Sequence, residues 1–499
     1  MAEAKTAGNG AGGAVAELTL LDRIVSEGRM ARDDNQAVYA KDLIGEFATQ
    51  VLDEGMTISN DTVAAISSRI AQIDELISAQ LNEIMHAPEF QKLEATWRGM
   101  SYLVSNTETS SRLKLRVINI TKKELLDDLE KAVEFDQSNL FKKVYEEEYG
   151  TLGGNPFSLL VGDYEFGRHP QDVALLEKLS NVAAAAHAPF IGAASAKLFD
   201  MDSFTDLGRP RDLSKIFESA ELTKWRGFRS SEDSRYVSLV LPHILMRLPY
   251  GPNTKPVDGF NYVEDVDGKN HSKYLWGNAA WALALRITEA FAKYSWAAAI
   301  RGVEGGGVVK GLPTHTFRTD EGDVALKCPT EIAITDRREK ELNDLGFITL
   351  CHAKGTDYSV FFGGATTQKA KQYNTDQANA NARISAQLPY VLAASRFAHY
   401  LKVIVRDKIG SFQTKDEISK YLNSWISGYV LLNDDAPQSS KAQYPLREAR
   451  VDVTEVAGRP GAYRATVFLR PHFQLEELTA SVRLVAELPA GAAAEAPAE

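Results

Sequence analysis

The sequence predicts an α/β fold of mixed α+β character, in which mixed sheets are covered by helices. Three observations lead to this class. Strand patterns alternate with helical patterns between residues 110 and 365, as in domains whose sheets are covered by helices. Long helical patterns precede and follow that region. Near residue 450 the apolar period changes to two, which predicts a β-hairpin close to the C-terminus.

The composition is that of a globular protein without a nucleic-acid or membrane partner. Of 499 residues, 44% are hydrophobic and 25% are charged, which is an ordinary balance. The net charge of −11 argues against a nucleic-acid partner, because such binding requires a basic surface. No apolar stretch reaches the roughly 18 residues that span a bilayer, and the N-terminus lacks the basic start of a secretory signal. We expect a cytoplasmic protein with no direct membrane insertion.

The first 60 residues are expected to form a partly disordered arm. Residues 1–16 are rich in Ala and Gly, and the tail 490–499 is rich in Ala, Pro and Glu. Such compositions bury too little apolar surface to order a chain, so both ends are expected to be disordered. Later in the arm, Leu43, Ile44 and Phe47 fit one face of a helix, which needs another surface to pack on.

After this arm, isoleucines and a leucine recur at spacings of four and three, which predicts an amphipathic helix with a near-heptad seam. The helical rhythm continues beyond Pro88 with Phe90, Leu93 and Trp97. The seam either packs within the core of its own domain or binds a helix of a partner. Its residues are Ile66, Ile70, Ile73, Ile77, Leu81 and Ile84.

From residue 110 the chain alternates between strand and helix patterns. In "LKLRVINI", Leu113, Leu115 and Val117 alternate with basic residues, which predicts a half-buried strand. Thr121 and Glu124 have the spacing of a capping box at the start of the next helix. Helices are also predicted at "QDVALLEKLSNVAAAAHA" and "DRREKELNDL", and strands at "FSLLVGDYEF", "APFIGAAS", "YVSLVLPHILM", "TEIAIT", "GFITLCHA" and "YSVFFGG".

The C-terminal part begins with two helices. "NARISAQLPYVLAASRFAHYLKVIVRDKIG" predicts one long helix that Pro389 can kink. Thr414 and Glu417 have capping-box spacing at the start of the second helix.

The hairpin follows these helices. Val451 and Val453 alternate with polar residues, "GRPG" supplies the turn, and the returning strand alternates from Tyr463 to Val467 and Leu469. One more strand is predicted at "SVRLVAELP", which includes Val482 and Leu484. This last strand either joins the sheet of its own chain or pairs with the sheet edge of a neighbouring molecule.

The glycine-rich segment "RGVEGGGVVKGLP" (301–313) invites comparison with a phosphate-binding loop. Gly306 and Gly311 have the glycine spacing of GxxxxGK[ST], but Leu312 and Pro313 stand where that motif requires Lys and Ser or Thr. A helical pattern precedes the segment, whereas a phosphate loop follows a strand. We expect these glycines to end that helix and to permit a close backbone approach or a positive φ.

No other catalytic or metal-binding pattern is complete. "VEDVDGKNH" lacks the glycine and the bidentate glutamate of a calcium loop, and neither HExxH nor GxSxG occurs. Cys328 and Cys351 are too few for a disulfide framework or a four-cysteine zinc site. We expect free thiols, no cofactor, no metal and no enzymatic activity.

Several segments in series resemble the large subunit of the type VI secretion contractile sheath, the TssC/VipB family. The resemblance runs from about residue 18 to residue 489, and only the two low-complexity ends lie outside it. It rests on "AKDLIGEFATQVLDEG", "LISAQLNEIMHAPEFQKLEATWRGMSYLV", "FSLLVGDYEF", "LMRLPYG", "IRGVEGGGVVKGLPTH" and "RISAQLPYVLAASRFAHYLK".

This resemblance implies a contractile-tail-sheath-like core whose C-terminal hairpin takes part in inter-subunit strand exchange. The implied partners are a small sheath subunit (TssB/VipA-like), copies of this chain in a helical lattice, the inner tube protein, a membrane-anchored baseplate and an AAA+ recycling ATPase, reached directly or through the small subunit. Linking segments would be the arm around Leu18–Val25, the hairpin and the late strand; candidate residues are Leu18, Leu20, Ile24, Val451, Val453, Tyr463, Val467, Leu469, Val482 and Leu484.

The expected domains are an arm (1–60), an N-terminal sheath domain (61–375), a C-terminal sheath domain (376–489) and a disordered tail (490–499). Two alternatives stay open at this point. One is a cytosolic α/β enzyme that binds a phosphorylated ligand at the 301–313 loop, and the other is a sheath subunit of a phage-tail-like injection particle.

Overall fold

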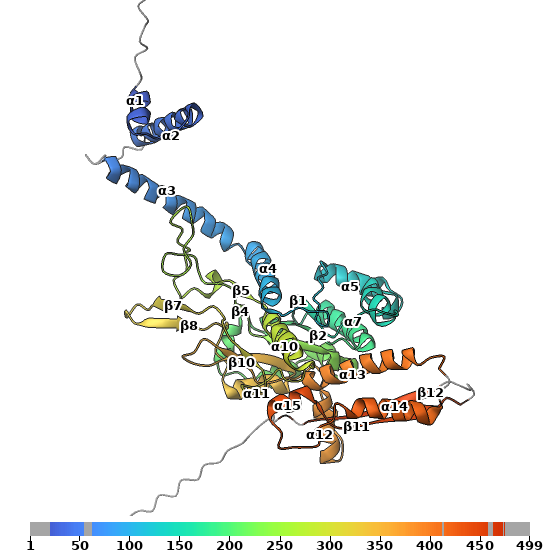
Figure 1. Ribbon diagram of the computed structural model, residues 1–499. Helices are drawn as coiled ribbons and strands as arrows, with labels where there is room; N and C mark the ends of the chain where they lie inside the picture. Colours follow the sequence, from blue (N-terminus) through green and yellow to red (C-terminus); the bar gives the residue numbers. More distant parts are fainter. Residues whose placement is uncertain (1–19, 54–61, 412–413, 458–462, 473, 475–499) are drawn as a thin grey trace, which may run out of the picture. The chain divides into compact units, whose positions relative to one another are not determined.

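The computed structural model describes residues 20–53, 62–411, 414–457, 463–472 and 474. The chain divides into two compact units, unit 1 (Met1–Ile77) and unit 2 (Ser78–Glu499) (Figure 1). The predicted boundary near residue 375 falls inside unit 2, and the predicted domain limits stay predictions.

Unit 1 consists of helices. Helices α1 (Leu20–Glu27) and α2 (Asp34–Asp53) contact each other, and Lys41 forms an ion pair with Asp22. The third helix, α3 (Thr62–Met85), begins in this unit. Helix α2 is the amphipathic helix that the pattern in the arm predicts.

A six-stranded mixed sheet forms the centre of unit 2. Its strand order is β1-β2-β3-β9-β10-β6; the first four strands are parallel, and β10 runs antiparallel to both of its neighbours. The strands are β1 (Leu160–Phe166), β2 (Phe190–Ala194), β3 (Val237–Leu241), β9 (Phe347–His352), β10 (Ser359–Phe361) and β6 (Val308–Val309). The strands predicted around β1, β2, β3, β9 and β10 are confirmed.

Helices cover both faces of this sheet (Figure 1). Leu239 of β3 belongs to the core that α7 (Pro170–Ala186) covers, and its neighbour Val240 belongs to the core under α10 (Ala280–Tyr294). Successive side chains of a strand point to opposite faces, so a sheet covered on both sides requires continuous apolar runs. Helix α4 (Pro88–Asn106) contacts α10.

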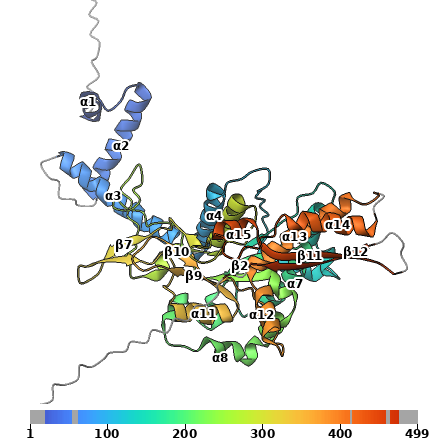
Figure 2. The ribbon, with the colours of Figure 1, turned by 60° about the horizontal axis from the view of Figure 1, so that its bottom comes forward.

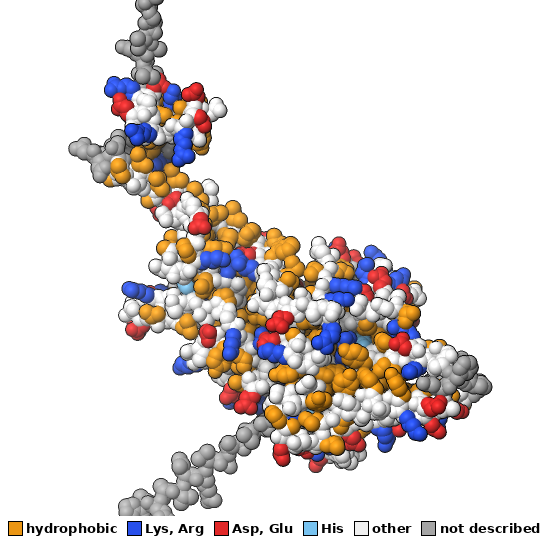
Figure 3. Space-filling model, in the orientation of Figure 1, with side chains coloured by type: hydrophobic (Ala, Val, Ile, Leu, Met, Phe, Trp, Pro, Cys, Tyr) orange, Lys and Arg blue, Asp and Glu red, His pale blue; other side chains and the backbone are white. Residues whose placement is uncertain are grey.

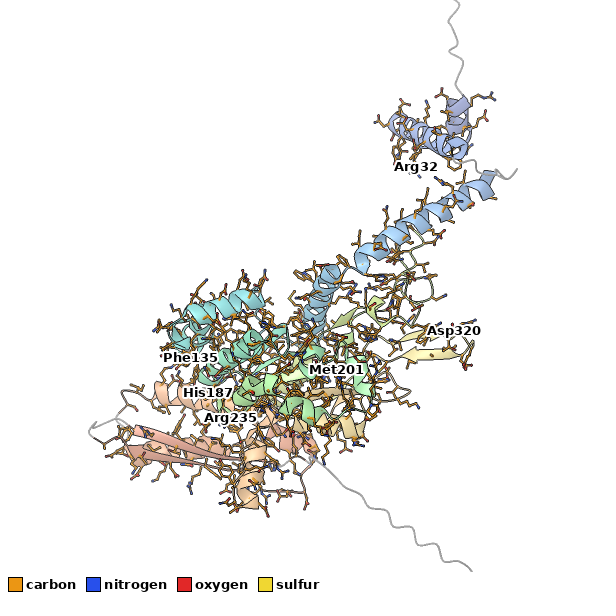
Figure 4. All side chains as sticks on the ribbon, turned by 180° about the vertical axis from the view of Figure 1, so that it is seen from behind. Arg32, Phe135, His187, Met201, Arg235 and Asp320 are labelled. Carbon is orange, nitrogen blue, oxygen red and sulfur yellow. The ribbon has the colours of Figure 1, made fainter. Side chains whose placement is uncertain are left out.

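Shorter elements surround this body. Figure 4 labels two positions in these surrounding elements, Phe135 and Asp320, which lie at opposite sides of the body. The helices are α5 (Lys122–Lys131), α6 (Asn139–Phe141), α8 (Leu213–Glu218), α9 (Thr223–Ser230), α11 (Asp336–Asp344), the π-helix η2 (Lys142–Tyr149) and the 3₁₀ turns η1 (Phe135–Gln137), η3 (Ala196–Phe199), η4 (Phe204–Gly208), η5 (Ala220–Leu222), η6 (Asp233–Tyr236) and η7 (His271–Lys273). Two small antiparallel pairs are β4 (Ile244–Leu245) with β5 (Trp276–Gly277) and β7 (His315–Arg318) with β8 (Val324–Lys327).

The C-terminal part packs two helices against the hairpin around a third core that includes Trp296 and Phe397 (Figure 2). Both predicted capping boxes are present, at Thr121 with Glu124 and at Thr414 with Glu417. The elements are α12 (Asp376–Ser385), α13 (Leu388–Asp407), α14 (Lys415–Ser427), α15 (Gln438–Gln443), β11 (Leu446–Glu455) and β12 (Tyr463–Pro471).

Four local predictions are wrong or incomplete. The predicted long helix is two helices, because the chain leaves the helix at Ala386 and Pro389 sits in the first turn of α13, where proline is tolerated. "TEIAIT" is a loop with one isolated bridge at Thr330, and the Glu331 side chain inside it is buried and anchored to other loops. "LKLRVINI" pairs with no strand among the described residues. Helix α10 ends at Ser295, which has a φ of 63°, before any glycine.

Among the described residues, the structure contains no helix long and apolar enough to span a membrane.

Candidate interaction surfaces

The C-terminal hairpin has one blocked edge and one open edge. Strands β11 and β12 form a two-stranded sheet by themselves (Figure 2). The Asn423 side chain of α14 donates to the Val451 carbonyl at 2.8 Å and accepts from the Val451 N–H at 2.9 Å. This side chain occupies the middle of the outer edge of β11, while the outer edge of β12 pairs with nothing in the described part of the chain.

The Asn423 contact also shows which backbone groups of β12 face outward. Because both polar groups of Val451 point away from β12, Val451 and its partner Val467 form a non-hydrogen-bonded pair. The next such pair is Val453 with Ala465. The N–H groups of Val467 and Ala465 therefore point to the open edge.

The predicted linking residues lie on different parts of this hairpin. Val451 and Val453 are buried in the third core, whereas Tyr463 on β12 is exposed. Val467 and Leu469 are half-buried against the same core. The two valines of β11 hold the hairpin on its helices, so the surface left for a partner lies on β12.

The other predicted linking residues provide less evidence for a surface that links subunits. Ile24 is exposed on α1 and Leu20 begins that helix. Leu18, Val482 and Leu484 lie outside the described residues.

The predicted helical seam is exposed. In the part of α3 that belongs to unit 1, Ile66, Ile70, Ile73 and Ile77 are each at least 40% exposed, while the polar Arg69 and Asp74 are buried. In the part that belongs to unit 2, Ile84 is exposed and Leu81 is half-buried. Figure 3 shows hydrophobic side chains along this helix. The interpretation as the core of the chain's own domain fails for these isoleucines.

The glycine-rich loop is bound to the sheet by its own backbone. The Gly302 N–H donates to the Phe361 carbonyl at 2.7 Å, and the Phe361 N–H donates to the Gly307 carbonyl at 3.0 Å. The N–H of Gly307 bonds the Gly302 carbonyl at 2.9 Å. These amides are already satisfied, and Lys310 is exposed. Gly302, Gly306 and Gly311 have positive φ, as predicted, so the loop is a tight connection and gives no support to a phosphate site.

Two ionic clusters with buried members were not predicted, because their members are far apart in the sequence. In the first, the Nδ1 and Nε2 atoms of His243 lie 2.5 Å from Glu331 and 3.1 Å from Glu165. The Glu331 carboxylate also accepts from the Ser203 hydroxyl at 2.7 Å and lies 3.4 Å from His271. This cluster joins the four segments that contain Ser203, His243, His271 and Glu331 to the end of β1.

The two carboxylates keep His243 charged. Burial by itself would lower the pKa of His243, but the hydrogen bonds and charges of Glu165 and Glu331 outweigh it and raise the pKa to about 10. Burial likewise favours a higher pKa for Glu331, and the hydrogen bond from His243 holds the pKa well below its usual range.

Replacing His243 with glutamine should therefore remove a pH-dependent part of the stability. A histidine whose pKa is raised from 6.5 to about 10 stabilises the fold fully below pH 6.5, and this contribution falls as the pH rises through 10. The difference in unfolding free energy between the parent and H243Q should shrink by up to about 1.4 kcal/mol per pH unit in this window. Urea unfolding of both proteins from about pH 6 to about pH 10 measures it; a constant difference would contradict the charged histidine.

The second cluster centres on Arg247 of the "LMRLPYG" segment. Its guanidinium donates to Glu264 at 2.6 and 2.9 Å and to Glu94 of α4 at 2.7 Å. Arg98 of α4 also bonds Glu94, at 2.7 Å, and the Tyr250 hydroxyl, at 2.9 Å. The cluster ties α4 to the segments that follow β4.

Two family descriptions and one curated relative match this chain. A family described as "EvpB/VC_A0108, tail sheath N-terminal domain" matches residues 67–368, and "EvpB/VC_A0108, tail sheath gpW/gp25-like domain" matches residues 377–488. The type VI secretion system sheath protein TssC1 of Pseudomonas aeruginosa is 52% identical over 449 residues, which cover 89% of this chain and 90% of that protein.

Two solved structures show a distant likeness. The anti-feeding prophage baseplate, studied by cryo-electron microscopy, contains a chain that matches with a TM-score of 0.37 and 10% identity, over 75% of this chain and 83% of that chain. The contracted helical sheath of the same prophage gives a TM-score of 0.26 and 12% identity, over 62% and 74% of the two chains.

The two family matches and the relative that is 52% identical over 89% of this chain establish that the chain belongs to the EvpB/VC_A0108 family of tail sheath proteins and is a large subunit of the type VI secretion contractile sheath.

Proposed function

We propose that this subunit pairs with a small sheath subunit and polymerises with copies of itself into a helical tube around an inner tube. The sheath assembles on a membrane-anchored baseplate in the bacterial cytoplasm, and its contraction propels the inner tube out of the cell. An AAA+ ATPase recycles the contracted sheath, so this chain performs no catalysis. A helical polymer requires contacts between unlike surfaces that do not close into a ring.

The observation that carries this proposal is the single open edge of the C-terminal hairpin. An open strand edge accepts a strand of another chain through backbone hydrogen bonds. Because Asn423 occupies the middle of the other edge, we assign lattice linking to β12. Backbone bonds of this kind can persist while rigid bodies rotate about their linkers, as contraction requires.

The second surface that the proposal uses is the exposed row on the part of α3 that belongs to unit 1, which contains Ile66, Ile70, Ile73 and Ile77. Isolated apolar residues are normal on a protein surface, but a continuous row at helical spacing marks a docking face. We assign this face to a helix of the small subunit. Pairing with the small subunit would bury this row of isoleucines. The open edge of β12 would then stay free to contact the next heterodimer in the lattice.

Replacing Ala465 with proline tests the open edge. Proline removes an outward N–H of an exposed residue and leaves the bonds between β11 and β12 intact. Loss of that hydrogen bond weakens each subunit contact by about 1 kcal/mol, and the effect repeats at every subunit of the polymer. In co-expression with the small subunit, negative-stain microscopy should show few or no tubules, while the heterodimer still co-purifies.

Two matched variants complete this test. Ala465→Val keeps the N–H and should form tubules. Thr466→Pro removes an inward N–H, which bonds Asp452 across the hairpin, and should destabilise the hairpin itself. Normal tubules with Ala465→Pro would refute the role of β12, and failure of the parent pair to form any tubules would refute the proposed function.

A further inference from the structure

The connection from α4 to α5 contains an extended segment with unused backbone groups. Residues 113–120 contain no helix, turn or bend, and Figure 2 shows them as open coil after α4. Within the described residues, no hydrogen bond involves the backbone N–H or C=O groups of Lys114 to Asn119. A protein rarely leaves such an extended run unpaired, because it is a template for another strand.

This segment runs beside the edge strand β1 in the same direction without pairing with it. Lys114 bonds Asn155 at 3.3 Å, and eight residues later Lys122 donates to the Glu165 carbonyl at 2.7 Å. Between them, the Ile120 carbonyl accepts from a tyrosine hydroxyl of β1 at 2.7 Å. Every one of these contacts is made by the end of a side chain. The outer edge of β1 is also unpaired in the described structure.

Leu115 and Ile120 pack against cores of this chain, but the two apolar side chains between them, Val117 and Ile118, lack a cover. Val117 is 71% exposed and Ile118 is 55% exposed. Successive side chains of an extended chain point to opposite faces, so an added strand alone would cover neither residue completely. A strand that belongs to a folded partner would cover both.

The charge of the segment indicates the chemistry of that strand. Arg112, Lys114, Arg116, Lys122 and Lys123 are basic, and no acidic residue stands between 112 and 123. A second copy that offered the same segment would bring these cations together, which is unfavourable. An incoming strand with acidic side chains is favoured.

We propose that residues 113–120 pair with a β-strand of the small sheath subunit that alternates acidic and apolar side chains. This inference rests on the proposed function, since it names where that partner binds. The added strand bonds the free backbone groups of residues 114–119, its acidic side chains face the cations, and the fold that carries it covers Val117 and Ile118.

Hydrogen exchange of the co-purified heterodimer tests the pairing. The amides of residues 114–119 have no partner within the described chain, so in the complex they should exchange about a hundredfold more slowly than their intrinsic rates only if a strand is added. A heterodimer in which they exchange at intrinsic rates would overturn this inference and leave the proposed function intact. If no heterodimer forms, both this inference and the proposed function are refuted.

A proline variant adds a measurement of affinity. Val117→Pro removes an N–H that bonds nothing in the described chain, so its thermal unfolding should match that of Val117→Ala. Its affinity for the small subunit should fall about tenfold relative to Val117→Ala, the factor for about 1.4 kcal/mol. Equal affinities of the two variants would contradict a backbone role for this segment.

A photo-crosslinking amino acid at Ile118 identifies the occupant. A product with the small subunit, mapped to an acidic extended segment, supports the proposal. A product with a second copy of this chain, or an internal product with residues 475–499, would overturn it.

Discussion

Replacing Glu264 with alanine is expected to lower the free energy of unfolding by about 3–5 kcal/mol. The Glu264 carboxylate binds the Arg247 guanidinium through two hydrogen bonds and accepts the Tyr250 N–H at 2.8 Å. The side chains of Arg247 and Glu264 are 5% and 1% exposed. Removal of the carboxylate leaves the guanidinium buried with Glu94 as the charge partner that remains, and an incompletely paired buried charge is costly.

Two comparisons separate this effect from a general loss of charge. The exposed pair of Glu232 with Lys371 has side chains that are 68% and 53% exposed, so Glu232→Ala should destabilise the protein far less than Glu264→Ala. The double variant Arg247→Met with Glu264→Leu should be less destabilised than Glu264→Ala, because it leaves no buried guanidinium. Urea unfolding midpoints measure all three. Equal losses for Glu264→Ala and Glu232→Ala would contradict the role of burial.

Local chemistry made much of this fold predictable from the sequence. The capping boxes at Thr121 and Thr414 are contained within four residues each, and the structure confirms both. The buried strands carry continuous apolar runs, and the hairpin alternates with period two. In these elements the signal lies in neighbouring residues, so no knowledge of distant contacts was needed.

The ionic clusters could not be predicted in this way. His243 meets Glu331 across 88 positions, and Arg247 meets Glu94 across 153. Lone charged residues in a sequence look like surface residues until the fold brings them together. The buried Glu331 also explains why an apolar run around it is a loop.

Residues 113–120 show a different limit. Their alternation predicts a strand, and the chain is extended there, but pairing requires a second strand. Period two reports the faces that a strand presents and contains no information on which chain supplies its neighbour. The sequence of one subunit can therefore contain a strand whose hydrogen-bonded neighbour is supplied by another subunit. This is the situation that we infer for residues 113–120.

Replacing Gly307 with alanine is expected to destabilise the protein by about 3 kcal/mol, the upper part of the usual cost of overpacking. An added Cβ would lie 2.5 Å from the Phe361 carbonyl oxygen and 2.7 Å from the Gly302 nitrogen. Both atoms are backbone and are joined by a hydrogen bond. The clash can be relieved only by displacing the loop from β10, which would break the bonds that hold β6 at the edge of the central sheet.

Gly311 provides the matched control within the same loop. Its φ is 71°, but an added Cβ would have no neighbour within 4 Å. Gly311→Ala should cost about 1 kcal/mol, since only the strain of the left-handed conformation remains. Comparable losses in urea unfolding for the two variants would contradict the steric role of Gly307, whose φ is not positive. A markedly larger loss of unfolding free energy for Gly307→Ala would show that close backbone approach requires this glycine. The reason is that the backbone of the loop is hydrogen-bonded to Phe361 of β10 in the central sheet.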